Sequence, residues 1–175
     1  MRLFVGLTPS QEFRDTLALL QSRLQAAGIT ARYLDPSNLH LTLAFIGDWP
    51  ENISGILPAV EQPFSLCLSC VGFFPEARVI WAGVEDSEEL NQLARKVRDH
   101  LSEAQIPFDP KPFVPHITLG RKPIVPRDFN PAEIEIPQAV MTVRDVCLYR
   151  SVHEEAGMVY SVIGSSSKNG GEHHV

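Results

Sequence analysis

Residues 38–47 read NLHLTLAFIG, and residues 113–121 read FVPHITLGR. Both stretches contain a histidine, an apolar residue, a threonine and a leucine within an apolar run that is typical of a strand. The polar members of the two patterns are His40, Thr42, His116 and Thr118. Alternate residues of a strand project from the same face, so each stretch should present an imidazole and a hydroxyl together. If a pseudo-twofold axis relates the two stretches, their polar pairs face each other across a cleft.

Patterns elsewhere in the sequence predict the elements that surround these two strands. A helix should begin at Ser10 and end at Gly28, and the best amphipathic helix covers residues 87–104. Residues 51–61 carry a weaker helical pattern. Strands are expected at residues 2–7, 64–74, 78–84, 139–151 and 158–164, the second and third of them forming a hairpin. The main helix precedes a His-x-Thr strand in each half, which indicates a weak internal duplication. We therefore expect an α+β, bilobal fold of two pseudo-symmetric halves, each with a mainly antiparallel sheet and helices outside, around a central cleft.

Length and composition indicate one domain. The chain has 175 residues, 44% of them hydrophobic, and we assign residues 1–164 to a single domain and residues 165–175 to a flexible tail. No apolar run approaches the length of a membrane span, and no signal-peptide pattern opens the sequence, so we expect a cytoplasmic protein with no membrane partner. The formal net charge is −6, whereas proteins that clamp long nucleic acids usually carry an excess of basic residues. If the chain binds nucleic acid, we therefore expect it to bind a terminus or a short piece of it.

Three cysteines and four further histidines offer alternatives to this site. Cys67 and Cys70 fall three apart in a predicted strand and should face opposite sides, so ordinary core thiols are expected there, not a redox or zinc pair. With Cys147 they make an odd, low count that argues against a disulfide framework. Zinc would need a third ligand beside His40 and His116, and none stands at a sensible spacing. The remaining histidines lie on a helix surface, in a polar turn and in the tail: His100, His153, His173 and His174. A metal site is therefore not predicted.

Two histidines and two hydroxyls suit paired acid–base catalysis on a phosphate. Histidine titrates near pH 6.5, so one ring can accept a proton while the other gives one to a leaving oxygen. The threonine hydroxyls can donate hydrogen bonds to phosphate oxygens, and Arg121 can offset the phosphate charge. A single histidine beside a threonine is usually only a satisfied polar residue, but the repetition favours catalysis.

A phosphate-binding loop of the Walker type and a Gly-x-Ser-x-Gly elbow are both absent from the sequence, which argues against ATP-driven ligation and serine hydrolase chemistry. Which histidine is the acid stays open at this point.

The two motifs, together with RLFVGL, RVIWAGV, LYRS and GMVYSVI, resemble the two-histidine (2H) phosphoesterases. The resemblance covers the chain to about residue 164 and is nearest to the bacterial RNA 2′,3′-cyclic phosphodiesterases, also called 2′-5′ RNA ligases or LigT-like proteins. It implies hydrolysis of RNA 2′,3′-cyclic phosphate ends to 2′-phosphomonoesters, without metal or cofactor, and reversible, ATP-independent 2′-5′ ligation. It also implies that His40 is the proton donor, that His116 is the proton acceptor, and that Thr42 and Thr118 bind phosphate oxygens.

Several residues depart from the family pattern or leave a choice open. Val114 stands where the family often has a basic residue, and Arg121 or Arg150 would replace that contact. Phe45 shares the predicted face of the motif leucines, so core packing is favoured over contact with a base, and Trp81 and Tyr149 are likewise expected in the core or at the rim. The substrate is expected to be RNA with a cyclic phosphate end or a small cyclic nucleotide, bound by a monomer. The alternative is a cleft that binds a nucleotide or RNA end without turnover.

Overall fold

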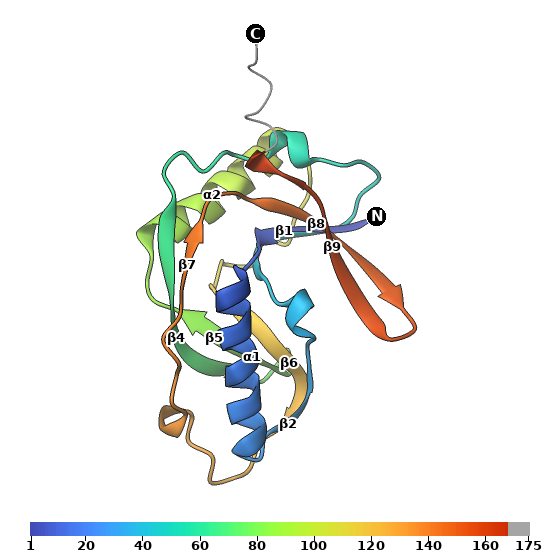
Figure 1. Ribbon diagram of the computed structural model, residues 1–175. Helices are drawn as coiled ribbons and strands as arrows, with labels where there is room; N and C mark the ends of the chain where they lie inside the picture. The colour runs from blue at the N-terminus through green and yellow to red at the C-terminus, as the bar shows by residue number, and fades with distance from the viewer. Residues whose placement is uncertain (168–175) are drawn as a thin grey trace.

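The computed structural model describes residues 1–167, which contain two long helices and nine strands (Figure 1). The helices are α1 (Gln11–Ala26) and α2 (Glu88–Glu103). The strands are β1 (Arg2–Leu7), β2 (Thr30–Tyr33), β3 (Leu41–Asp48), β4 (Phe64–Phe74), β5 (Val79–Val84), β6 (Ile117–Ile124), β7 (Val140–Val143), β8 (Cys147–Glu154) and β9 (Gly157–Ser165). Single 3₁₀ turns occur at η1 (Pro36–Asn38), η2 (Ser54–Ile56) and η3 (Pro131–Glu133). The predicted α+β class is confirmed.

All strand pairs are antiparallel, and they form one path in the order β7-β4-β5-β6-β3-β1-β8-β9, with β2 beside β6. Within this path, β3 belongs to a group with β1, β8 and β9, whereas β6 belongs to a group with β2, β5, β4 and β7. The two groups join where Leu41 of β3 pairs with Ile117 of β6, a junction of one residue pair. The strands therefore form one continuous path and not the two separate sheets that we expected, and the two motifs meet at its narrowest point.

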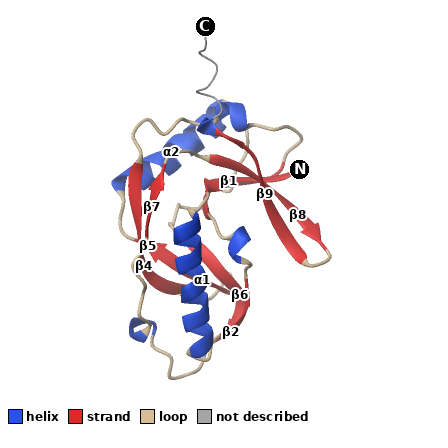
Figure 2. Ribbon diagram, in the orientation of Figure 1, coloured by secondary structure: helices blue, strands red, loops and turns tan. Residues whose placement is uncertain are grey.

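Each long helix carries a serine cap and one apolar face, as its sequence predicts. Ser10 accepts a hydrogen bond from the backbone N–H of Phe13 at 3.3 Å, and Ser87 accepts one from the N–H of Leu90 at 3.1 Å. Leucine and other apolar side chains at helical spacing then pack into the core. Figure 2 shows α1 beside β6 and β2, while α2 lies toward the other end of the molecule. There α2 contacts β3. Neither helix of the described chain is long and apolar enough to span a membrane.

Three predicted segments differ in the structure. The helix expected over residues 51–61 is reduced to the 3₁₀ turn η2. The single strand expected over residues 139–151 is two strands, because β7 pairs with β4 whereas β8 pairs with β1 in the other group. Two residues that we assigned to the flexible tail are placed in the structure: Ser165 ends β9, and buried Ser166 accepts a hydrogen bond from the N–H of Val146 at 2.9 Å. The rest of that predicted tail, residues 168–175, lies outside the described residues.

The cysteines are also placed differently from expectation. Ser69 has no partner in the register between β4 and β5, since Leu68 pairs with Val84 and Cys70 with Gly83. This irregularity shifts the alternation by one residue, so that Cys67 and Cys70 share the face opposite the core. Cys70 is exposed and Cys67 is half-buried, so the prediction of core thiols is wrong for Cys70. Cys147 is buried.

Candidate active site

Each His-x-Thr motif ends in a β-bulge at its leucine. Val5 of β1 pairs with Ala44 and Gly6 pairs with Thr42, so Leu43 is left out of the register. Leu119 is left out of the register between β5 and β6 in the same way. Both leucine side chains are fully buried, and the burial pattern over the first five residues of β3 and β6 is identical. The two motif strands therefore share a backbone irregularity as well as a sequence pattern.

A helix side chain hydrogen-bonds the carbonyl at each bulge. Nε of Arg98, on α2, donates to the carbonyl oxygen of Leu43 at 3.3 Å. Nε2 of Gln21, on α1, donates to the carbonyl oxygen of Leu119 at 3.0 Å. Since a bulge disrupts the ladder locally, these donors satisfy carbonyls beside the motifs.

The same two side chains also hold the loops that precede the motifs. The guanidinium of Arg98 donates to the carbonyl oxygen of Lys111 at 2.7 Å, and Gln21 donates to the carbonyl oxygen of Leu34 at 2.9 Å. Both loops contain an Asp-Pro turn: Asp35 accepts from the N–H of the second residue after it at 2.9 Å, and Asp109 does the same at 3.0 Å. The internal duplication thus extends from the loop through the motif to the helix that supports it.

The bulges also decide which side chains beyond the motifs reach the site. Without a bulge, Phe45 would follow Leu43 onto the buried face, as we expected from the alternation. With Leu43 bulged, Phe45 turns to the polar face and is 36% exposed, so the prediction that it packs in the core is wrong. Arg121 occupies the equivalent position after the bulge at Leu119. The duplication therefore presents an aromatic ring from one motif strand and a guanidinium from the other.

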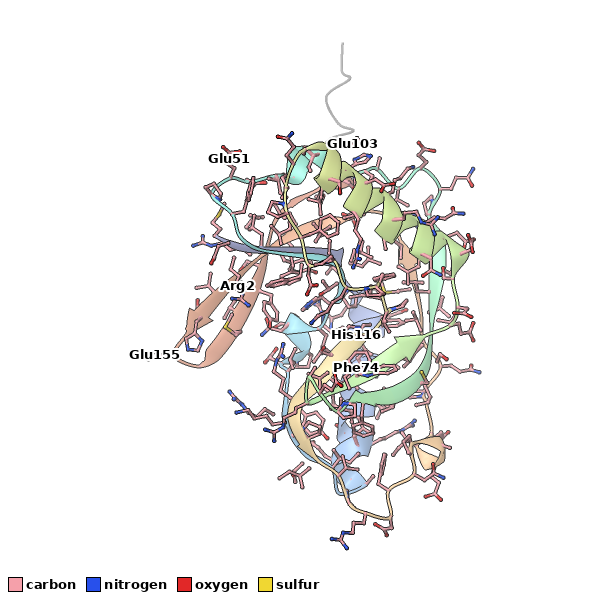
Figure 3. The ribbon with its side chains drawn as sticks, turned by 180° about the vertical axis from the view of Figure 1, so that it is seen from behind. Arg2, Glu51, Phe74, Glu103, His116 and Glu155 are labelled. Atoms are coloured by element: carbon pink, nitrogen blue, oxygen red, sulfur yellow. The ribbon has the colours of Figure 1, made fainter. Side chains whose placement is uncertain are left out.

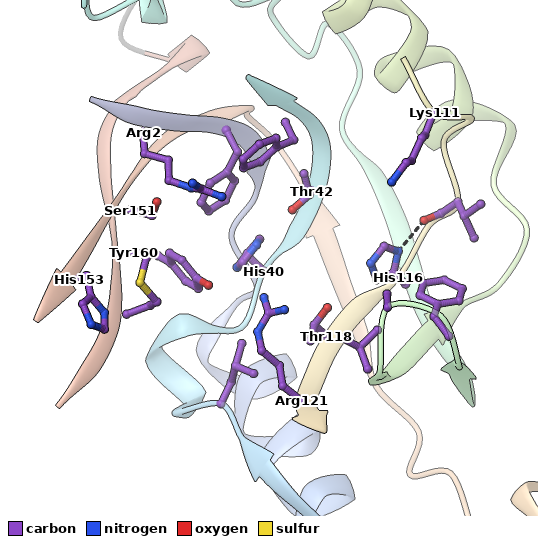
Figure 4. Close-up of a pocket in the computed structure, with 18 of the residues that line it drawn as sticks. Arg2, His40, Thr42, Lys111, His116, Thr118, Arg121, Ser151, His153 and Tyr160 are labelled. Atoms are coloured by element: carbon purple, nitrogen blue, oxygen red, sulfur yellow. Dashed lines mark hydrogen bonds between the residues drawn. The ribbon is translucent and has the colours of Figure 1, made fainter. Parts of the chain in front are cut away.

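One pocket of about 960 Å³, the central pocket, brings the predicted residues together. Its polar lining residues include His40, Thr42, His116, Thr118 and Arg121. In Figure 4 these labelled side chains converge from β3 on one side and β6 on the other, and Arg121 points toward His40. Each histidine precedes its strand by one residue, rather than lying within it, and each remains beside its threonine.

The two imidazoles are held in the same way. Nδ1 of His40 lies 2.7 Å from the carbonyl oxygen of Asn38, and Nδ1 of His116 lies 2.7 Å from the carbonyl oxygen of Val114. A carbonyl oxygen only accepts, so Nδ1 carries the hydrogen in both rings. Nε2 is therefore the atom that is left to exchange a proton, and each ring can be either acid or base.

Aromatic rings surround His40 on the side of β1, β8 and β9. Phe4 lies 4.5 Å from the His40 ring between centroids, Tyr160 lies 5.0 Å away edge to face, and Tyr149 lies 5.5 Å away. Burial is the largest cause that lowers the pKa of His40, and the positive charges of His116 and Arg121 add to it, so that the pKa falls to about 4. In the unliganded pocket His40 is therefore neutral at pH 7.

Sequence reasoning missed two cations and several apolar residues of the central pocket. Arg2 and Lys111 line it, with Phe4, Met158 and Tyr160, whereas Arg150, which we considered, does not. The guanidinium of Arg2 lies 5.2 Å from the centroid of the Phe45 ring. Alignment of the two Asp-Pro turns could have pointed to Lys111, but nothing local in the sequence marks Arg2.

The other aromatic and histidine residues that we considered lie in the core, at the rim of the central pocket or in structural contacts. Tyr149 is buried and Trp81 is half-buried beside His116, as predicted for core or rim positions. His100 is not a free surface residue, because its Nδ1 lies 2.8 Å from the carbonyl oxygen of Ile56. His153 lies at the edge of the central pocket. Within residues 1–167, no group of three or more His, Cys, Asp or Glu side chains gathers that could hold a metal ion.

Comparisons with known proteins place this architecture in a family. Over 98% of its length the chain is 30% identical to an RNA 2′,3′-cyclic phosphodiesterase of Thermotoga maritima, covering 97% of that protein. It is 34% identical to a protein of the same name from Archaeoglobus fulgidus, with 91% of this chain and 96% of that one covered.

Solved structures agree with the sequence comparison. Escherichia coli LigT in its apo form superposes with a TM-score of 0.76 at 25% identity, over 94% of this chain and 95% of LigT. LigT complexed with phosphate gives a TM-score of 0.70 at the same identity and coverage. The model of the 2′-5′ RNA ligase superfamily matches residues 9–155, which include both His-x-Thr motifs and both supporting helices. The chain therefore belongs to the 2′-5′ RNA ligase superfamily.

Proposed function

We propose that this chain is an RNA 2′,3′-cyclic phosphodiesterase that opens the cyclic phosphate to a 2′-phosphomonoester without a metal ion or nucleotide cofactor. The observation that carries the proposal is the convergence of two equivalent His-Thr pairs on one pocket that no carboxylate lines. The names of the relatives from T. maritima and A. fulgidus support the choice of substrate.

The proposed reaction uses Nε2 of each ring. Nε2 of neutral His116 accepts a proton from water while the water oxygen attacks phosphorus. The bond between phosphorus and O3′ breaks, and Nε2 of protonated His40 gives its proton to O3′. The product carries a 2′-phosphate and a 3′-hydroxyl, His116 ends protonated and His40 ends neutral. Proton exchange with solvent then restores the starting state.

The threonines and Arg121 bind the phosphate that reacts. The hydroxyls of Thr42 and Thr118 lie beside the two imidazoles on opposite strands and donate to the non-bridging phosphate oxygens. Arg121 offsets the negative charge that builds up on these oxygens, the usual role of a preorganised cation in phosphate chemistry. The existence of a LigT complex with phosphate supports phosphate as a ligand of a protein with this fold.

The low pKa of His40 is consistent with a proton donor that becomes protonated only when the substrate binds. Burial and the positive charge of Arg121 keep the ring neutral in the empty pocket. A phosphate between the two rings brings a negative charge close to His40, which favours the protonated form and raises its pKa. The acid is then formed only where the leaving oxygen is in place.

A 5′-hydroxyl of a second RNA can take the place of the attacking water. The product is then a 2′,5′ linkage, the energy comes from the cyclic phosphate, and the reaction approaches an equilibrium without ATP. We infer that hydrolysis and this ligation share the same pocket. We further propose that the chain acts as a monomer in the cytoplasm.

The proposal is tested with RNA that ends in a 2′,3′-cyclic phosphate, incubated in EDTA. We expect a 2′-phosphate product, and we expect His40→Ala or His116→Ala to lose roughly 10²-fold or more in rate while the circular dichroism spectrum stays unchanged. Activity that EDTA abolishes and zinc restores would point to a metallo-hydrolase. Saturable binding of the RNA with no product on chromatography would leave a binding module instead.

A further inference from the structure

A second hollow of about 430 Å³, the side pocket, lies next to the central pocket and shares Phe74 and Val79 with it. It is lined by Phe73, Phe74, Pro75, Arg78, Val79, Pro123, Val125, Phe129 and Pro131. The two pockets are therefore adjacent, and the side chains of Phe74 and Val79 form the partition between them. Nothing in the proposed chemistry uses the side pocket.

The side pocket is built from aromatic rings and prolines. The rings of Phe73 and Phe129 meet edge to face with their centroids 6.0 Å apart. On its other side the partition touches the catalytic groups, since the ring of Phe74 stands edge to face 4.9 Å from His116, and both residues are labelled side by side in Figure 3. Aromatic faces of this kind stack on nucleobases with little preference for sequence.

Charge distinguishes these two pockets from the rest of the protein. The chain has 21 acidic and 15 basic residues, yet neither pocket has an Asp or Glu among its lining residues. The central pocket contains Arg2, Lys111 and Arg121, and the side pocket contains Arg78. A third hollow along α2, in contrast, has mixed charge, since Glu61, Glu89 and Asp99 line it together with Arg95 and Lys96. The two adjacent pockets without carboxylates thus form a basic tract in an acidic protein, which is complementary to a polyanion.

Backbone geometry holds Arg78 beside this tract. Arg78 has a φ of 53°, in the left-handed region that non-glycine residues seldom adopt, and its carbonyl oxygen accepts a hydrogen bond from the N–H of Lys122 at 2.8 Å. The next residue, Val79, pairs directly with Arg121. The two guanidiniums therefore come from neighbouring positions, since Arg78 directly precedes β5 and Arg121 lies on the adjacent strand β6, and each lines one of the two pockets.

We propose that the side pocket binds the nucleotide that precedes the terminal, cyclic-phosphate nucleotide of an RNA. Its base stacks against the aromatic and proline side chains, and Arg78 binds the phosphate that links the last two nucleotides. This inference rests on the proposed function and deepens it, because it makes an oligonucleotide end, rather than a cyclic mononucleotide, the preferred substrate.

The test compares kcat/KM for a 2′,3′-cyclic mononucleotide with kcat/KM for a dinucleotide that ends in the same cyclic phosphate. In the wild-type chain we expect the dinucleotide to be favoured on the order of tenfold, the lower range of one stacked base. Val125→Asp places a carboxylate in the side pocket at an exposed position, and Arg78→Asn removes the charge with a residue that tolerates a positive φ. Both should abolish the dinucleotide advantage and leave mononucleotide hydrolysis unchanged.

Two control variants make the outcomes distinct. Arg78→Lys keeps the charge and should keep most of the advantage, and Arg95→Gln, in the third hollow, should change neither rate. Equal kcat/KM for the two substrates in the wild-type chain, or an advantage that survives Val125→Asp and Arg78→Asn, would overturn the inference and leave the proposed function standing. Failure of the wild-type chain to hydrolyse either substrate would instead overturn the proposed function.

Discussion

Burial and nearby positive charge both lower the pKa of His40. The rings of Phe4, Tyr149 and Tyr160 exclude water from one side of the imidazole, and the positive charges of His116 and Arg121 oppose its protonation from the other. Burial also raises the pKa of Tyr149 to about 12, so that phenol is neutral as well. His40 and Tyr149 are therefore both uncharged at pH 7 in the empty pocket, and a bound phosphate would supply the negative charge that favours protonated His40.

The protonation of His40 should follow phosphate binding. In the free protein, an NMR titration of the His40 ring is expected to give a pKa of about 4. Addition of the 2′-phosphate product should raise that pKa, because a nearby negative charge stabilises the imidazolium. It follows that product binding takes up protons at pH values between the free and the bound pKa. An unchanged His40 pKa with the product bound would contradict its role as proton donor.

Arg121 and Arg150 offer a matched pair of surface arginines. Both are exposed, but only Arg121 lines the central pocket. We expect Arg121→Gln to lower kcat/KM for a cyclic phosphate roughly tenfold to a hundredfold, the cost of one lost charge-assisted hydrogen bond. Arg150→Gln should leave it unchanged. Equal effects of the two variants in a steady-state assay would show that Arg121 does not bind the phosphate.

Among the elements, the two motif strands are easy to predict from the sequence, but the face to which their later side chains point is not. Alternation correctly put a histidine and a threonine on one face of each strand. It failed two to three residues later, because the bulges at Leu43 and Leu119 leave no mark in the sequence beyond an ordinary buried leucine. Phe45 was therefore assigned to the wrong face.

Gln21 and Arg98 act as positioning residues in this account, because each bonds a carbonyl directly beside a catalytic pair. We expect Gln21→Met and Arg98→Met to lower kcat several-fold with little change in KM, since the motif strand loses its support and the substrate contacts remain. Each change should also lower the free energy of unfolding by about 1–3 kcal/mol, the net contribution of the two hydrogen bonds that each side chain makes. Steady-state kinetics below the unfolding temperature measures the first effect.

Exposed residues on the same helices provide controls for these substitutions. Gln25→Met on α1 and Arg95→Met on α2 make the same substitutions at exposed positions, where no hydrogen bond to a motif carbonyl is lost. Both variants should retain the wild-type kcat. A Gln21→Met protein that is less stable but keeps the wild-type kcat would reduce Gln21 to a purely structural role.

In the whole molecule, two groups of strands meet at the pair Leu41 and Ile117, each of which is the residue after a motif histidine. The repeated motif allowed the class of fold to be predicted, together with four residues that line the central pocket. The junction, the separation of β7 from β8 and the side pocket depend on contacts between residues far apart in sequence, for which local patterns carry no signal. Arg2 illustrates the limit: it reaches the central pocket only because β1 lies between β3 and β8.

The central claim is that the two motifs act on one phosphate, and a double-variant cycle tests it most directly. The rates of hydrolysis of a cyclic-phosphate RNA end are measured for His40→Ala, His116→Ala and the double variant, with folding checked in parallel. Groups that act as a unit give strongly non-additive losses. We predict that the double variant is about as slow as the slower single variant. Losses that multiply, as expected of two independent groups, or single variants that keep the wild-type rate, would contradict a shared site.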